Sequence, residues 1–403
     1  RQSGFLSPSF GSSQNTGSSV STPYFYLISD DKDLTIKPQL FNNDKFLLQN
    51  EYRQKTKKTL SLVDFGFVNG HDSGVDDKGG NRTHIFTKSI IDLSLDDYIN
   101  SSLRVDYQKT SNDNYLKIFN VESPILPVSN DVLESVIKLD LEHENYDFTA
   151  SLERYETLKG SNSDRYQYVL PTYNFNKNLY LESLKGGLNF NSYGNNTLKD
   201  TNITTSTLFN DLNYSALNKF LENGIKTNFN IFLKNVNTIG KNNPKYEESP
   251  RSELMSAYTY NVSLPMVKKT NTNFNTLEPK LSLRLSPHDM KNNRELERRI
   301  DINNIFNSNR LSMNDAFEGG ESITLGLNFK KEKIKIKKDI SEIEQYIDFR
   351  LASVLRLKEE KNIPTKSTLN KKQSNIFGEF NFKPIENISL GYNFSLTEDL
   401  NTF

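Results

Sequence analysis

Residues 224–236 read GIKTNFNIFLKNV, and their polarity alternates along most of this stretch. Two sets of residues share a face of an extended chain: Ile225, Thr227, Phe229, Ile231 and Leu233 on one side, and Lys226, Asn228, Asn230 and Lys234 on the other. Successive side chains of a strand point to opposite faces, so this period of two predicts a strand with one apolar and one polar face. Its length suits a strand that crosses a membrane, which needs about 9–11 residues.

The same alternation recurs along the chain. It is found in ELMSAYTYNVSL at 253–264, ESITLGLNF at 321–329 and NISLGYNFSL at 387–396. Polar connectors such as SDDKD and FNND separate the runs, and no interior linker marks a second domain. We therefore treat residues 1–403 as one barrel domain, and at roughly 20 residues per strand with its connector we expect about 18 strands.

Composition narrows the class of protein without fixing it. The chain has 50 basic and 50 acidic residues among 403, so its net charge attracts no partner of either sign and does not suggest nucleic acid. No run approaches the roughly 18 apolar residues of a membrane helix. Barrels in membranes are also hydrophilic on average, because only alternate residues face lipid. Long strands with a wet second face favour a closed antiparallel barrel over a soluble sandwich, whose strands are usually about five or six residues.

Residues for catalysis or metal binding are scarce. The chain has no cysteine, and its four histidines, His71, His84, His143 and His288, are scattered without metal-ligand spacing. Paired glycines lack the strand–loop–helix setting of a phosphate loop. We therefore expect no catalytic residue, no metal and no cofactor, and we do not expect an enzyme.

Two charged stretches allow more than one interpretation. In KKEKIKIKK at 330–338, lysines alternate with Ile334 and Ile336. They form either a row of ammonium groups for anionic phosphates or a strand end rising out of the membrane. We prefer the strand end, and we interpret RELERRI at 294–300 as a solvated loop.

The first 28 residues, RQSGFLSPSFGSSQNTGSSVSTPYFYLI, read as two strands that are each interrupted by a proline. Proline has no N–H for a sheet ladder and is normally confined to edges, strand starts and bulges. Pro8 and Pro23 therefore predict two weakened strands at the start of a strand-rich chain.

The same opening resembles the start of the barrel in the LptD family of lipopolysaccharide-assembly proteins, also known as the organic solvent tolerance protein family. The residues that carry this first match are Ser3, Gly4, Phe5, Leu6, Pro8, Pro23, Tyr24, Phe25, Tyr26, Asp33, Leu34, Thr35, Pro38, Glu51, Tyr52 and Arg53. A second match in NIFNSNRLSMNDAFEGGESITLGLNF rests on Asn309, Arg310, Phe317, Gly319 and Glu321. DRYQYVLPTYNF at 164–175 is similar to a midbarrel strand of the family.

The resemblance implies an outer-membrane β-barrel of a Gram-negative bacterium that inserts lipopolysaccharide into the outer leaflet. The sugars would pass through a wet lumen, and the acyl chains would leave through a lateral gate between the first and last strands. The implied partners are lipopolysaccharide, a plug lipoprotein of the LptE type, membrane lipids and periplasmic bridge proteins that bind a jelly-roll domain. We expect that jelly-roll domain and the last several strands to lie outside this chain.

Two features depart from the family pattern. Members often carry cysteines that tie the barrel to the periplasmic domain, and this chain has none. The family barrel is also larger than about 18 strands. At the end of the chain, Asp399 and Asn401 break the alternation expected before a terminal aromatic residue such as Phe403.

The resemblance also gives the two prolines a possible role. If the first strands meet the last strand at a closure seam, Pro8 and Pro23 would each remove a ladder bond worth roughly 0.5–1.5 kcal/mol, and the seam would open more readily. From the pattern alone they are ordinary bulge or strand-start prolines. Three other classes stay open: another outer-membrane receptor or porin, a soluble all-β structural or adhesive protein, and an enzyme embedded in a barrel.

Overall fold

A computed structural model describes residues 2–14, 16–42, 45–71, 80–160, 164–270, 273–337, 340–385 and 387–397. The chain divides into two compact units. The first unit contains residues 1–176, 193–208 and 238–251, and the second contains residues 177–192, 209–237 and 252–403. The end of the chain at 398–403, including Asp399, Asn401 and Phe403, lies outside the described residues.

The chain is all-β. The strands wholly in the first unit are β1 (Gly4–Phe5), β2 (Ser9–Ser13), β3 (Gly17–Ser21), β4 (Tyr24–Ser29), β5 (Lys32–Phe41), β6 (Phe46–Lys55), β7 (Thr59–His71), β8 (Gly80–Asp92), β9 (Asn100–Thr110), β10 (Val132–His143) and β11 (Tyr146–Thr157). Those that contribute to both units are β12 (Tyr166–Leu181), β13 (Gly186–Lys199), β14 (Ile203–Ala216), β16 (Lys226–Lys241) and β17 (Arg251–Ser263). The second unit adds β15 (Lys219–Phe220), β18 (Met266–Lys269), β19 (Asn273–Ser286), β20 (Gly320–Lys337), β21 (Ile340–Arg356), β22 (Ile376–Ile385) and β23 (Ile388–Leu396).

Helical structure in the described ranges is limited to α1 (Tyr115–Ile118) and two 3₁₀ turns, η1 (Glu182–Leu184) and η2 (Thr365–Ser367). None of these helices is long and apolar enough to cross a bilayer. RELERRI forms no helix and lies in the connection between β19 and β20, as predicted. The lysine-rich stretch at 330–338 continues β20 as far as Lys337, and its side chains from Ile334 onward lie outside the described part.

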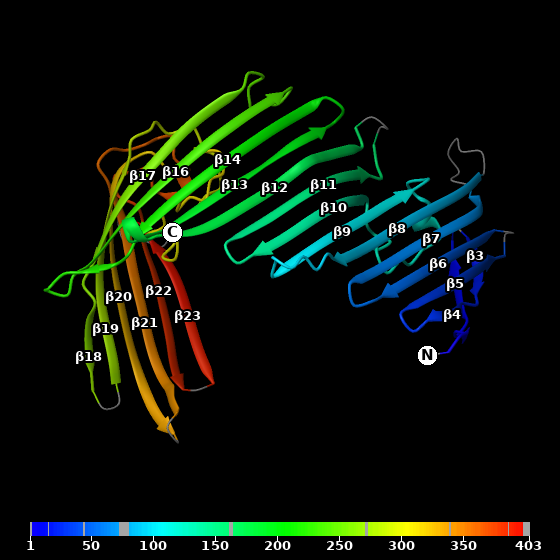
Figure 1. Cartoon of the computed structure of the whole chain (residues 1–403), viewed down its shortest axis with the longest axis horizontal. Helices are drawn as coiled ribbons and strands as arrows, with labels where there is room; N and C mark the ends of the chain where they lie inside the picture. The colour runs from blue at the N-terminus through cyan, green and yellow to red at the C-terminus, as the bar shows by residue number, and fades with distance from the viewer. Residues whose placement is uncertain are drawn as a thin grey trace. The chain divides into compact units, whose positions relative to one another are not determined.

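The described strands belong to one antiparallel sheet, which confirms the predicted fold class and is consistent with a large barrel. β5 to β11 pair in chain order in the first unit, and β19 to β23 do so in the second (Figure 1). Four of the 23 strands (β2, β4, β15 and β18) continue the preceding strand after an interruption of two or three residues and pair with a strand other than the one they continue. If each interrupted pair is counted as one, the 23 strands of the described residues form 19 spans, near the predicted 18.

Both early prolines interrupt strands as predicted. Pro8 lies between β1 and β2, and Pro23 lies between β3 and β4. β1 pairs with β4 and β2 pairs with β3, so both interruptions fall within one ribbon. Across it, the N–H of Leu6 donates to the carbonyl oxygen of Pro23 at 2.8 Å.

Each unit has one sheet face covered by a long loop, here called the covered face, and an opposite open face. In the second unit, Tyr260, Leu283, Ile323 and Leu355 form a continuous cross-strand row on the open face. Its larger side chains are about 40% exposed, with Tyr260 at 44% and Leu283 at 42%. The neighbouring row on the covered face is polar where it crosses β17, β19 and β20, at Asn261, Ser282 and Thr324. The predicted segregation of polar and apolar faces is therefore present.

In the first unit, the loop at 111–131 packs its apolar side chains onto the covered face. Tyr115, Leu116 and Phe119 belong to one buried cluster with Val68 and Phe86. The hydroxyl of Tyr115 hydrogen-bonds Nδ1 of His84, and Nε2 of His84 lies 3.3 Å from Oδ1 of Asp64. Asp64 also accepts hydrogen bonds at 3.0 Å from the side chain of Gln49, so this buried carboxylate is satisfied.

The contact between Gly66 and His84 gives a test of this packing. A Cβ on Gly66 would lie 2.4 Å from the His84 ring, so Gly66→Ala should displace the ring and destabilise the protein by about 1–3 kcal/mol. The measurement is the midpoint of urea unfolding. Gly187→Ala is the matched control, because a Cβ there meets nothing within 4 Å. Equal midpoints for the two variants would show that the packing is wrong.

Candidate functional site

A polar pocket of about 750 Å³ lies on the covered face of the second unit. Alternation brings its strand residues to one side: Ser215 from β14, Lys226 and Asn228 from β16, Asn261 from β17, Glu278 and Lys280 from β19, Asn328 from β20 and Arg350 from β21. The loop between β19 and β20 adds Ile302, Asn303 and Phe306. Register aligns Glu278, Asn328, Arg350 and Glu379 across four neighbouring strands.

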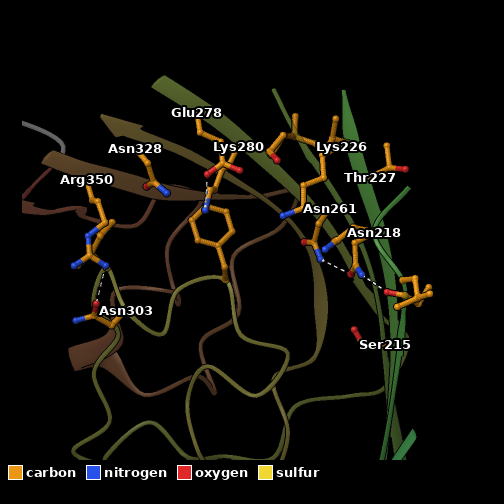
Figure 2. Close-up of a pocket in the computed structure, with 18 of the residues that line it drawn as sticks. Ser215, Asn218, Lys226, Thr227, Asn261, Glu278, Lys280, Asn303, Asn328 and Arg350 are labelled. Carbon is orange, nitrogen blue, oxygen red and sulfur yellow. Dashed lines mark hydrogen bonds and ion pairs between the residues drawn. The ribbon is translucent and has the colours of Figure 1, made fainter. Parts of the chain in front are cut away.

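The pocket carries more positive than negative charge. Figure 2 shows Lys226, Lys280 and Arg350 around it, with Glu278 as the acidic lining residue. Lys280 lies 3.2 Å from Glu278, and Arg350 donates to Glu379 at 2.5 Å and to the side-chain oxygen of Asn303 at 3.1 Å. Within the described ranges, Lys226 makes no ion pair. An anionic group can therefore enter without displacing an internal partner of Lys226.

Amide side chains and one aromatic ring complete the lining. Asn228 and Asn261 are joined by a 3.5 Å hydrogen bond, and Asn261 keeps a buried side-chain oxygen that has no partner among the described residues. The Phe306 ring lies against Gly326, where a Cβ would come within 2.6 Å of it, so glycine permits this close approach. Amides both donate and accept hydrogen bonds, which suits a ligand rich in hydroxyl groups.

The loop at 287–319 forms one wall of the pocket and is anchored by a buried carboxylate. Glu318 accepts hydrogen bonds from Arg310 at 2.7 and 2.6 Å and from Arg356 at 2.6 Å. Arg310 also donates to the hydroxyls of Ser322 and Thr324 on β20. The loop is thereby tied to β20 and β21 by charge-assisted bonds, which are shorter and stronger than neutral ones.

The electrostatics of Glu318 favour its ionised form. Burial alone would raise the pKa of this carboxyl, but the charges of Arg310 and Arg284 and the hydrogen bonds from Arg310 lower it to about 2. Its folded pKa lies below the usual value of 4.5. The resulting stabilisation is therefore present above pH 4.5 and is lost as the pH falls toward 2.

Further contacts hold the same loop on the covered face. Phe317 stacks on Phe232 with ring centroids 4.7 Å apart, and the Arg284 guanidinium lies 4.9 Å from the Phe317 ring. Lys234, which is fully buried, pairs with Asp211 at 2.7 Å and donates to the backbone oxygen of Asn314. A dozen buried side chains, among them Ile305, Leu311 and Val354, form the apolar part of this contact.

The structure places Arg310, Phe317 and Gly319 of the second family match at this anchor. Phe317 and Gly319 flank Glu318, and a Cβ on Gly319 would lie 2.4 Å from the carbonyl oxygen of His288, so no larger residue fits. Glu321 begins the exposed part of β20 on the open face and does not join the anchor. Sequence reasoning singled out Arg310 but missed Glu318, Arg356 and Arg284. The signal in the sequence that could have identified Glu318 is its position as a charged residue between the two motif residues Phe317 and Gly319.

The residues of the first family match lie in the first unit. Gly4 and Phe5 form β1, Leu6 follows it, and Tyr24 begins β4. Glu51 and Arg53 lie on β6, where Arg53 donates to Asp33 at 2.7 Å and Lys37 donates to Glu51 at 3.1 Å. Arg53 also lies 3.3 Å from a carboxylate oxygen of Glu51, so Asp33, Glu51 and Arg53 form one ion-pair network. Nothing in the structure tests the predicted role of Pro8 and Pro23 in a gate.

Within the described ranges, no three histidine, aspartate or glutamate side chains gather in a group that could hold a metal ion. The buried Asp64, His84 and Tyr115 lie together beneath the loop at 111–131, and Asp64 and the His84 side chain are fully buried. Their contacts join the loop to the sheet.

Comparison with known proteins identifies relatives. The chain matches the family model described as LPS transport system D (LptD) over residues 92–403. The LPS-assembly protein LptD of Idiomarina loihiensis is 27% identical over 158 residues, which are 39% of this chain and 20% of that protein. Its namesake from Pseudoalteromonas translucida is 35% identical over 118 residues, 29% of this chain and 15% of that protein. The protein of that name from Pseudomonas fluorescens is 26% identical over 180 residues, 44% of this chain and 18% of that protein.

These alignments span a fifth or less of the length of the three relatives. The family match includes the pocket, the loop at 287–319 and the motif residues Phe317, Gly319 and Glu321. It begins after the first motif block, which ends at Arg53.

The anchor predicts a strong effect of Glu318→Gln. Removing this charge leaves Arg310 and Arg356 buried without a carboxylate, which should cost about 3–5 kcal/mol and release the loop at 287–319. Limited proteolysis of the folded protein should then cut this loop faster. Glu297→Gln is the control, because Glu297 is exposed and pairs with Lys366 on the surface. Equal cleavage of both variants would contradict the anchor.

Proposed function

The chain belongs to the LptD family, whose model is described as LPS transport system D, and on this basis we propose that it forms part of an outer-membrane barrel that inserts lipopolysaccharide (LPS) into the outer leaflet. The open face contacts lipid in this proposal, and the covered face lines a wet lumen. The sugars of LPS pass along the covered face and its pocket. The acyl chains leave sideways through a lateral gate between the first and last strands of the barrel.

The observation that carries this proposal is the opposite polarity of the two faces. On the open face, large apolar side chains such as Tyr260, Leu283 and Leu325 stay exposed, which suits a lipid environment. On the covered face, amides and charges line a pocket large enough for a small saccharide. Its cations suit the phosphate and carboxylate groups of an anionic glycolipid.

The proposed mechanism needs no covalent chemistry. The sugars exchange hydrogen bonds with water for bonds to the amides of Asn228, Asn261 and Asn328, so the path costs little free energy. The proposed assembly has two kinds of protein partner: a plug lipoprotein of the LptE type and periplasmic bridge proteins. Metals and cofactors have no part in the proposed transport.

A photoreactive amino acid tests the proposed path. Placed at Asn328 in the full-length protein in living cells, it should form an adduct with LPS on irradiation, because this side chain lines the pocket. The adduct is detected by immunoblotting for LPS sugars. The control position is Leu325, which lies on the open face of the same strand. Adducts at Leu325 without any at Asn328 would contradict passage along the covered face.

The gate generates a second test. Pro8→Ala combined with Pro23→Ala would restore two N–H groups, strengthen the ribbon of β1 to β4 by about 1–3 kcal/mol and slow LPS delivery to the cell surface. Delivery is measured by surface labelling of new LPS. Pro279→Ala within β19 is the control, because this proline lies inside a continuous strand and away from the proposed seam. If the double variant assembles normally and delivers LPS at the normal rate, the two prolines have no role in opening the gate.

A further inference from the structure

We propose that a cluster of cations in the first unit binds the phosphate-bearing headgroup of a glycolipid in the surrounding membrane. The rim cluster consists of Lys109 on β9, Arg154 and Glu156 on β11, Arg165, and Tyr166 at the start of β12. It is separate from the pocket, whose lining residues all belong to the second unit. The inference rests on the proposed membrane position of the chain.

The two exposed cations of the rim cluster, Lys109 and Arg154, lie on the open face. Lys109 pairs across the strands with Ile85, and Ile85 pairs with Phe65. Arg154 lies two residues after Leu152, so the two side chains point to the same side of the sheet. Ile85, Phe65 and Leu152 are 41%, 43% and 45% exposed. Lys109 and Arg154 therefore share a face with the apolar band.

The rim cluster also lies at one end of that band. Lys109 and Glu156 are each one residue from the end of their strands, and Tyr166 begins its strand. The connections at this end, 111–131 and 158–165, are longer than those at the other end, 93–99 and 144–145. In outer-membrane barrels the long loops are extracellular and the short turns are periplasmic. The end with the longer connections therefore faces the headgroups of the outer leaflet.

Cations outnumber carboxylates in the rim cluster. Glu156, only 2% exposed, lies 3.0 Å from Lys109 and 3.1 Å from Arg165, and accepts a hydrogen bond from the Tyr166 hydroxyl at 3.3 Å. Asp113 takes a second bond from Arg165 at 2.6 Å. Arg154 is 4.0 Å from Glu156, and it donates hydrogen bonds to two neutral groups, the carbonyl oxygen of Gln108 and the hydroxyl of Ser135.

This arrangement holds positive charge in place beside an apolar surface. The buried carboxylate of Glu156 attracts the three cations and holds them close together. The side chains of Lys109 and Arg154 remain 38% and 27% exposed. Arg154 lies over the Tyr107 ring at 5.7 Å, and Lys109 lies over the Tyr166 ring at 5.9 Å. A lipid can place its acyl chains on the apolar band while its phosphate accepts charge-assisted bonds from the two cations.

The test compares cations on the two faces of the neighbouring strands β9, β10 and β11. The rim variant carries Lys109→Gln and Arg154→Gln. The control variant carries Arg104→Gln and Lys138→Gln, which replace a cross-strand pair on the covered face with exposures of 39% and 37%. The full-length protein in phosphatidylcholine nanodiscs is titrated with fluorescent lipid A, either phosphorylated or with its phosphates removed.

The rim variant should bind phosphorylated lipid A about tenfold more weakly, because cations near the membrane surface attract anionic headgroups. The control variant should bind it like the unchanged protein, and removal of the phosphates should abolish the difference. Equal binding by the rim variant and the unchanged protein would overturn the proposal. Displacement by equimolar inorganic phosphate would also overturn it, because the site would then select the free ion.

If the double variant does not fold, Arg154→Gln alone replaces it in the titration, because this single change leaves the Lys109–Glu156 ion pair in place. The rim variant should still form the LPS adduct at Asn328. If the rim variant loses lipid A binding but still forms the adduct, the rim site and the transport path are separate functions. Absence of the adduct in the unchanged protein would instead refute the transport path itself.

Discussion

Side chains on a strand alternate between two faces, and this constraint organises the whole chain. A row such as Tyr260, Leu283 and Ile323 can stay apolar only because its neighbours Asn261, Ser282 and Thr324 point the other way. A one-residue slip in register would exchange the two faces. The pocket, the loop anchors and the rim cluster all depend on this register.

The covered face is stabilised by buried charge as well as by apolar contact. Glu318 is enclosed by arginines that come from the loop, β19 and β21, and these residues are far apart in sequence. Burying four charged groups costs free energy unless each is paired and hydrogen-bonded. The cluster is therefore a specific anchor, and it fixes the loop that supplies Asn303 and Phe306 to the pocket.

Much of the architecture follows from local pattern. Alternation predicted the strands and their two faces, and proline chemistry predicted the interruptions at Pro8 and Pro23. The span count came close because short turns and long loops average to roughly 20 residues per strand with its connector. The anchor could not be predicted in this way, because the meeting of Arg284, Glu318 and Arg356 depends on the path of the loop at 287–319. The same limit applies to the rim cluster, whose members come from β9, from β11 and from the start of β12 with the residue before it.

The central claim is that the covered face is wet and the open face lies in lipid. The chain has no cysteine, so single cysteines can report each face without background. Lys226→Cys and Asn328→Cys on the covered face are compared with Tyr260→Cys and Leu325→Cys on the open face, using a water-soluble thiol reagent on the full-length protein in native membranes. The account predicts labelling at the first two positions, and at the last two only after detergent is added. Equal labelling of all four positions in intact membranes would contradict it.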